Sequence, residues 1–243
     1  MAYRPLDSKI LRVSRVWRGT IEAFPLGIQA PTLWIVMNLR LDSIFARRWL
    51  LCVAPGLLWL GAIASGLGAL AWYDNTPADP GQPAAEWPSG STIDRSEHGM
   101  TLIMFAHPRC PCTRASLGEL EKIVAHCPPT VTPWVVFFKP DGAEEGWEQT
   151  DLWRTAAAIP GAHVICDLGG AEARRFHATA SGQTLLYSAG GELLFSGGIT
   201  FARGHAGDNA GRTAIESFAA GNSPGYHQTP VFGCAINATT EQE

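Results

Sequence analysis

The chain has 243 residues, of which 46% are hydrophobic and only 16% are charged, and its formal net charge at pH 7 is −4. That amount of apolar sequence is enough for one sizeable core, so one globular domain with an appendage is expected. Residues 49–243 carry ten basic against nineteen acidic side chains and show no phosphate-binding loop. This balance argues against nucleic acid as a partner.

The first 48 residues are basic, with eight lysines or arginines against three acids, and are expected to lie in the cytoplasm. Residues 1–36 have no clear hydrophobic period. Residues 37–48, which begin at Met37, are a short basic segment of the kind that precedes a signal anchor. We therefore expect translation to begin at Met37, which would make residues 1–36 a start-site artefact; otherwise they are a disordered cytoplasmic tail.

An uncharged run of 25 residues follows, at residues 49–73, and predicts a transmembrane helix. Arg47 and Arg48 precede the run and Asp74 follows it, so the part of the chain after the run is expected outside the cytoplasm. A buried core helix and a cleaved signal peptide are the alternatives. The run exceeds the roughly 7–15 apolar residues of a signal peptide, which favours an uncleaved anchor. The prediction is a single-pass protein of a bacterial inner membrane with a periplasmic C-terminal domain.

Beyond the span, residues 74–91 are rich in Pro, Gly, Ala and Ser and are expected to form a linker. Residues 92–221 are expected to form the domain, and residues 222–243 a C-terminal tail. Apolar and β-branched runs predict strands at residues 101–105, 131–138, 163–166, 184–187 and 192–196. Helical spacing and capping residues predict helices at residues 113–126, 151–158 and 171–177, and from a cap at Asp208 or Asn209 to residue 220. This order predicts an α/β domain whose sheet has helices on both faces.

The motifs of residues 90–220 resemble those of a known family. A strand ends in Cys110-Pro111-Cys112, which opens a helix, and further βα units precede a hairpin with a glycine turn. This order resembles the thioredoxin-like redoxins, in particular the variants with one inserted βα unit, the membrane-anchored TlpA type and the copper-linked Sco type. Segments 105–112 and 204–209 also resemble RedB-type redoxins. The resemblance implies a thioredoxin-like fold with a central mixed sheet.

Two features depart from the family pattern. The family motif has two residues between its cysteines, whereas Pro111 alone separates Cys110 from Cys112. The family also places a cis-proline before the threonine that begins the hairpin strand, where this chain has Gln183 before Thr184. Both departures weaken a direct transfer of thioredoxin chemistry.

Cys110 and Cys112 are the candidate catalytic residues. At the N-terminus of a helix, unpaired N–H groups and the helix dipole favour a thiolate, and Arg109 and Arg114 add positive charge. A lowered thiol pKa is what attack on a disulfide needs. The resemblance gives Cys110 the role of the attacking thiol and Cys112 that of the resolving one. We expect Cys110, beside Arg109, to be the more reactive.

The spacing of the two thiols indicates how the pair would behave. Pro111 favours an extended Cys110, which separates the two Cα atoms to about 6–7 Å, the upper end of the bridgeable range. A disulfide there would be strained and readily reduced. This favours a donor or isomerase of disulfides that acts on a cysteine-containing periplasmic protein; a structural bridge is the alternative.

A copper site is the competing interpretation, with ligands drawn from His107, Cys110, Cys112 and His205. Sco-like proteins, by the same resemblance, hold copper with a cysteine pair and a distal histidine. His205 is expected near the cysteines if the strands ending at residues 105 and 198 run in the same direction. No other cofactor is expected. A redoxin binding module that has lost turnover is the third hypothesis.

The remaining cysteines are not expected to be catalytic, with the exception of Cys234. Cys52 lies in the apolar span and Cys166 in a strand expected to be buried, so both are expected to be inert. Cys127 ends a helix without basic neighbours and is interpreted as structural.

Cys234 lies in the tail, where apolar Val231 and Phe232 predict docking. An extended chain from residue 222 to residue 234 reaches up to about 40 Å, more than the roughly 30 Å width of such a domain. Cys234 is therefore predicted to be an alternative disulfide partner or a third metal ligand at the site. A lone or intermolecular thiol is the alternative.

Overall fold

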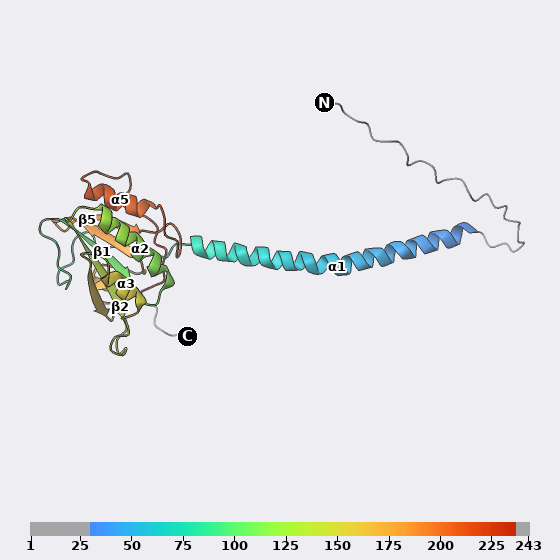
Figure 1. Cartoon of the computed structure of the whole chain (residues 1–243), viewed down its shortest axis with the longest axis horizontal. Helices are drawn as coiled ribbons and strands as arrows, with labels where there is room; N and C mark the ends of the chain where they lie inside the picture. The colour runs from blue at the N-terminus through green and yellow to red at the C-terminus, as the bar shows by residue number, and fades with distance from the viewer. Residues whose placement is uncertain (1–29, 237–243) are drawn as a thin grey trace, which may run out of the picture. The chain divides into compact units, whose positions relative to one another are not determined.

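The computed structural model describes residues 30–236, which begin with a long helix, α1 (Ala30–Asn75) (Figure 1). The part of α1 from Arg47 to Asn75 is long and apolar enough to cross a membrane by length and composition. This part contains the span expected at residues 49–73. The helix begins at Ala30, before that span, in a stretch where the sequence has no clear hydrophobic period. Most of the suspected start-site segment, residues 1–29, lies outside the described residues.

The chain from Ala62 onward is a separate compact unit that contains one mixed sheet. Its strands are β1 (Met100–Ala106), β2 (Val131–Lys139), β3 (His163–Leu168), β4 (Gln183–Tyr187) and β5 (Leu193–Gly198), in the order β3-β2-β1-β4-β5. Strands β1, β2 and β3 are parallel, β4 is antiparallel to β1, and β5 is antiparallel to β4. Strand β5 therefore runs in the direction of β1, as the sequence analysis required for its site.

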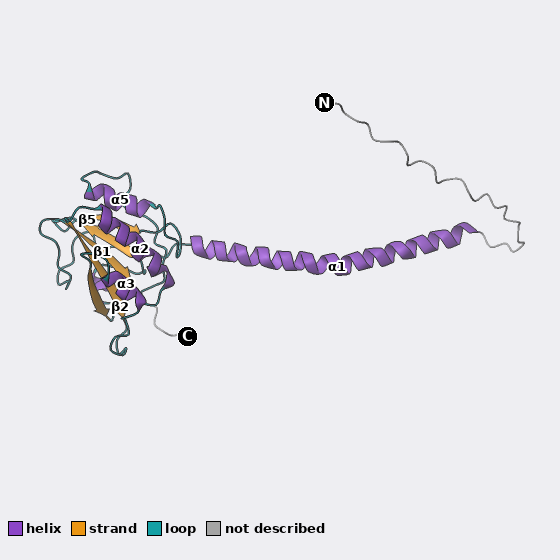
Figure 2. Cartoon of the chain, in the orientation of Figure 1, coloured by secondary structure: helices purple, strands orange, loops and turns teal. Residues whose placement is uncertain are grey.

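Four helices complete the domain: α2 (Pro111–His126), α3 (Asp151–Ala157), α4 (Ala171–Arg175) and α5 (Ala210–Ala219) (Figure 2). The order of strands and helices is the one expected from the sequence. Helix α5 begins where a cap was expected, because the Asn209 side chain accepts a hydrogen bond of 2.8 Å from the backbone N–H of Arg212.

The two faces of the sheet carry separate apolar layers. Alternation along β1 sends Leu102 and Met104 to one layer and Ile103 and Phe105 to the other. Helices α2, α3 and α5 cover the first layer with the buried side chains Leu117, Leu120, Ile123, Leu152, Ala156, Ala214 and Ile215. This layer supports α2, which carries Cys110 at its start.

The second face is covered mainly by irregular chain, because α4 has only five residues. The Trp87 ring makes edge contacts with the rings of Phe176 and Tyr187, with 5.2 Å between centroids in each pair. Ile93 and Ile236, from opposite ends of the domain, are buried in the same layer. Helices thus lie on both faces, but on this face the N-terminal segment and the tail complete the cover.

Residues 74–91 pack against the domain, which differs from the linker that their composition predicts. Backbone hydrogen bonds join Ala78 to Val231, Ala84 to Phe176 and Trp87 to Gly191. Main-chain groups make these bonds. The composition of the segment, rich in Pro, Gly and Ala, therefore does not predict that it docks.

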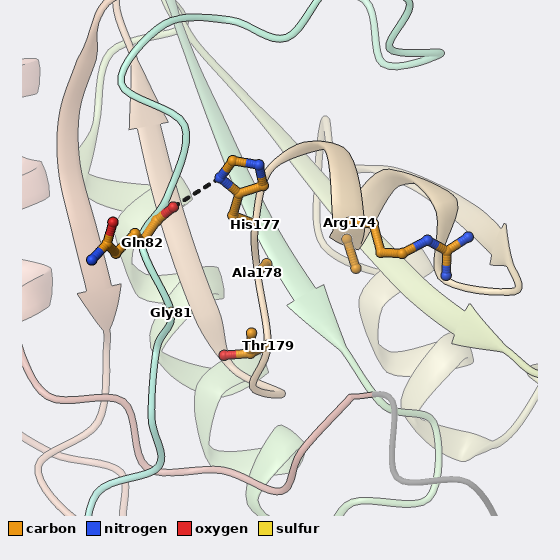
Figure 3. A pocket seen from close by; sticks show the side chains of 7 residues that line it. Gly81, Gln82, Arg174, His177, Ala178 and Thr179 are labelled. Carbon is orange, nitrogen blue, oxygen red and sulfur yellow. Dashed lines mark hydrogen bonds between the residues drawn. The ribbon is translucent and has the colours of Figure 1, made fainter.

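The docked segment leaves an open cavity of about 330 Å³ on its path (Figure 3). The cavity is lined by Gly81, Gln82, Ala173, Arg174, His177, Ala178 and Thr179. His177 Nδ1 lies 3.0 Å from the Gln82 carbonyl oxygen across it. None of the lining residues is a cysteine.

Candidate functional site

Cys110 is the N-cap residue of α2, with φ −85° and ψ 119°, and Pro111 is the first helical residue. This extended conformation is the one that a following proline favours. The Cys110 N–H donates to the His107 carbonyl at 3.1 Å, and the Thr113 N–H donates to the Cys110 carbonyl at 3.1 Å. The thiol of Cys110 is therefore held at the positive end of the α2 dipole.

The sulfur of Cys234 lies 2.9 Å from the sulfur of Cys110. Both residues are free thiols, and sulfur atoms in a disulfide are about 2.05 Å apart, so a shift of about 1 Å would join them. The structure thus brings Cys234 to the site, in the place where the sequence analysis predicted an alternative disulfide partner.

The tail reaches the site in two stages. It first follows β5, where the Ser196 N–H donates to the His227 carbonyl at 3.0 Å. It then crosses to the loop before β4, where the Ser181 N–H donates to the Cys234 carbonyl and the Ile236 N–H donates to the Thr179 carbonyl, both at 2.8 Å. The backbone of the tail, and not only its thiol, is therefore fixed at the site.

Ser181 connects three parts of the site, and the sequence analysis did not identify it. Its hydroxyl accepts a hydrogen bond from the His107 N–H at 2.9 Å and lies 2.8 Å from the Thr113 hydroxyl. Its backbone N–H holds Cys234. Ser181 is buried, so these bonds are shielded from water. A serine among small residues carries no motif, and only the pairing of distant segments reveals its place.

The three thiols have different proton affinities. Hydrogen bonds with Cys112 and then with Cys234 hold the pKa of Cys110 well below its usual range. The pKa values of Cys112 and Cys234 are raised, in each case chiefly through the hydrogen bond with Cys110. Cys110 is therefore the thiol that most readily loses its proton, and Cys112 and Cys234 hold theirs more strongly. This distribution supports the prediction that Cys110 is the more reactive thiol.

His107 and Arg109 pack against aromatic side chains. The Arg109 N–H donates to His107 Nδ1 at 3.2 Å, and the His107 ring stacks on Phe138 and meets Trp147 edge-on. Burial is the largest influence on His107 and lowers its pKa. The Arg109 guanidinium lies 4.5 Å from the centre of the Trp147 ring. Trp147, which the sequence analysis did not identify, thus packs against both residues.

Gln183 occupies the position where the family has a cis-proline, and the described residues contain no cis peptide bond. Its side-chain carbonyl accepts from the Thr179 N–H at 3.0 Å, and its amide donates to the Pro80 carbonyl at 2.8 Å. Thr184 is buried, and its hydroxyl donates to the Gly182 carbonyl at 3.2 Å. Gln183 therefore fixes the loop that receives the tail.

His205 is exposed, and its Nδ1 lies 2.7 Å from the Arg203 carbonyl oxygen. Within residues 30–236 no group of three or more His, Cys, Asp or Glu side chains is arranged to hold a metal ion. Copper binding by His107, Cys110, Cys112 and His205 stays a prediction.

The other cysteines lie apart from the site. Cys166 is exposed, which corrects the expectation of a buried strand, because β3 is an edge strand that pairs only with β2. Cys127 is half-buried, and burial, with the nearby Glu216 carboxylate, raises its pKa to about 11. Cys52 is exposed on α1.

The strand order and the cysteine at the start of the helix after β1 define a thioredoxin-like α/β fold with a mixed five-stranded sheet. No known family model matches the sequence, and no curated protein is similar enough to match it.

Several solved structures resemble this chain at low sequence identity. An uncharacterized conserved protein from Geobacillus kaustophilus has 16% identity and a TM-score of 0.49, over 69% of this chain and 95% of that one. A secreted Mycobacterium tuberculosis disulfide oxidoreductase homologous to E. coli DsbE has 16% identity and a TM-score of 0.37, over 57% and 96%. StoA from Bacillus subtilis has 16% identity and a TM-score of 0.34, over 58% and 97%.

Proposed function

We propose that this chain is a membrane-anchored thiol–disulfide oxidoreductase whose working pair is Cys110 and Cys234. The observation that carries the proposal is the 2.9 Å distance between their sulfur atoms at the N-terminus of α2. A thiolate is the nucleophile in disulfide exchange, and Cys110 is the thiol whose pKa is lowered. A second thiol within bonding reach then completes the exchange.

The proposed reaction has two displacements. The Cys110 thiolate attacks one sulfur of a partner disulfide, so that a mixed disulfide forms and the other partner sulfur leaves as a thiolate. Cys234 passes its proton to that leaving sulfur and attacks the Cys110 sulfur. The second partner sulfur leaves, takes a proton from solvent, and the Cys110–Cys234 bond forms. Two electrons pass to the partner, and the reverse sequence oxidises a partner dithiol.

Cys112 has a different part in this proposal from the resolving role that the family resemblance implies. The pKa of the Cys112 thiol is raised, chiefly through its hydrogen bond with Cys110, and the same interaction lowers the pKa of Cys110, which supports a role for Cys112 in stabilising the thiolate. Cys234 contacts the Cys110 sulfur directly and needs no strained Cys110–Cys112 ring.

The proposed location is a bacterial inner membrane, with the domain in the periplasm. The apolar part of α1 and the basic residues before it support this orientation. Protein disulfides persist in that compartment, so a cysteine-containing periplasmic protein is the proposed partner. Affiliation with the TlpA, Sco or RedB types is proposed from their motifs alone.

Insulin reduction by the full-length protein in detergent, with dithiothreitol as the final reductant, tests the proposed function. Cys110→Ser should lower the rate at least about 100-fold, because no thiolate remains to attack. Cys127→Ser is the matched control, because Cys127 lies away from the site, and it should keep the wild-type rate. Equal rates for wild type and Cys110→Ser would contradict the proposal.

A further inference from the structure

The tail that carries Cys234 also covers the nucleophile. Cys110 is only 2% exposed, and Val231 and Ile236, on either side of Cys234, are 0% and 1% exposed. A partner disulfide must bring a sulfur atom into contact with the Cys110 sulfur. In this conformation the tail occupies that approach, so the tail has to move before a partner can react.

Main-chain groups hold the tail. Two backbone hydrogen bonds, from Ser181 to Cys234 and from Ile236 to Thr179, bind it to the loop before β4. Such bonds are made by main-chain groups, so another extended segment that presents a cysteine to Cys110, with a glycine before that cysteine, can make them. The loop therefore provides an edge for one extended segment at a time.

The contact at Gly233 shows how closely the tail fits this edge. A Cβ atom at Gly233 would overlap the Ser181 carbonyl oxygen. The Gly233 carbonyl also accepts a hydrogen bond of 2.5 Å from the Arg203 guanidinium. The residue before Cys234 is thus fixed on both sides, and only a residue without a side chain fits there.

We propose that residues 229–236 act as a releasable strap on the Thr179–Ser181 edge. A cysteine-bearing segment of the partner displaces the strap and forms the mixed disulfide with Cys110. The returning strap then delivers Cys234 to the Cys110 sulfur and displaces the reduced partner from the same edge. This inference rests on the proposed function and adds that resolution and product release are one movement.

The strap makes access to the site depend on the redox state. In the oxidised protein, the Cys110–Cys234 bond ties the strap to its edge, and a partner segment can pair there only after its thiolate has broken that bond. In the reduced protein only non-covalent contacts hold the strap, so it can exchange with a partner segment. Opening of the strap should therefore be rarer after oxidation.

Amide hydrogen exchange on the full-length protein in detergent tests the redox dependence. The amides of Ser181 and Ile236 donate the two hydrogen bonds between the strap and the Thr179–Ser181 edge, and both should exchange at least about ten times faster in the reduced protein. The amide of Gly182 is the internal control, because it donates to Phe105 in β1 and not to the tail. It should exchange at similar rates in both forms. Equal exchange of Ser181 and Ile236 in both forms would overturn the strap.

A matched pair of glycine variants tests whether the strap limits access. Gly233→Ala should push the strap from Ser181, and iodoacetamide should modify Cys110 in the reduced variant at least about five times faster than in wild type. Gly225→Ala is the control in the same tail, because a Cβ there meets nothing within 4 Å. It should leave the rate within about twofold. The rate is read from fragment masses that separate Cys110 from Cys112, at a pH where the alkylation rate no longer changes with pH.

Two results would overturn the strap as a barrier. In the first, the Ser181 amide exchanges faster in Gly233→Ala but the alkylation rate of Cys110 is unchanged. In the second, Gly225→Ala accelerates the alkylation of Cys110 as much as Gly233→Ala does. Neither measurement needs turnover. If amide exchange and alkylation give the results expected for the strap but the protein does not reduce insulin, only the proposed function is overturned. An active protein with redox-independent exchange would overturn the strap alone.

Discussion

The sulfur atoms of Cys110 and Cys234 lie 2.9 Å apart although 124 positions separate the two residues in the chain. Cys110 and Cys112, two positions apart, would close a minimal ring. The two possible disulfides therefore close loops of very different length, and this difference has measurable consequences for stability.

Oxidation should stabilise the protein strongly if it joins Cys110 to Cys234. In the chain-entropy account, a disulfide that closes the loop between Cys110 and Cys234 raises the free energy of unfolding by about 4–5 kcal/mol. A disulfide between Cys110 and Cys112 closes too small a loop to approach that value. Urea unfolding of the oxidised and reduced full-length protein in detergent measures the difference. Cys234→Ser should lose the effect of oxidation, and a gain below about 2 kcal/mol in wild type would contradict the Cys110–Cys234 bond.

The pH profile of alkylation should separate Cys110 from Cys127. The pKa of Cys110 is lowered, so the thiolate that reacts persists as the pH falls, and its rate should change little between pH 6 and pH 9. The pKa of Cys127 is raised to about 11, so its thiolate fraction should fall about tenfold for each pH unit below that value. Mass spectrometry after timed iodoacetamide treatment gives both profiles. A Cys110 rate that falls tenfold per unit from pH 8 would show an ordinary thiol.

Glu119 should be a major contributor to stability. Its carboxylate is fully buried and accepts hydrogen bonds from the Arg212 guanidinium at 2.5 Å and the Gly207 N–H at 2.9 Å, which joins α2 to the segment before α5. Glu119→Ala leaves Arg212 without this partner and should lower the free energy of unfolding by about 3–5 kcal/mol. Exposed Glu121 on the same helix is the control, and Glu121→Ala should change the free energy of unfolding by less than about 0.5 kcal/mol. Similar small effects in both variants would contradict this role.

The orientation of α1 can be tested with alkaline phosphatase fusions. A fusion after Asp74 should be active, because the basic residues before the apolar run keep the N-terminus in the cytoplasm and place Asp74 outside. A fusion after Arg48 should be inactive, because it ends before the run. A stable but inactive Asp74 fusion would contradict the proposed topology.

Local sequence patterns predict much of this fold. The continuous apolar run of β1 and the spacing of Leu117, Leu120 and Ile123 in α2 identify the strand and helix that present Cys110. The extended Cys110 follows from Pro111, a neighbour in the chain. These features depend on residues close in sequence, so a single sequence is sufficient to predict them.

The rest of the site depends on contacts between distant segments. Chain length shows that Cys234 can reach the site, but the pairing of its backbone with Ser181 sets its position. Trp147 comes from a loop without a motif, and the exposure of Cys166 depends on β3 being the sheet edge. No local pattern encodes these relationships.

Disulfide mapping of the oxidised full-length protein tests the Cys110–Cys234 pair most directly. Trypsin cleavage after Arg109 and Arg114 leaves Cys110 and Cys112 in one peptide, so the mapping is done on wild type and on Cys112→Ser. After alkylation of free thiols without reduction, peptide 110–114 should be linked to peptide 213–243 in both proteins. An unlinked, alkylated Cys234 in both, with Cys110 joined to Cys112 in wild type, would contradict the account.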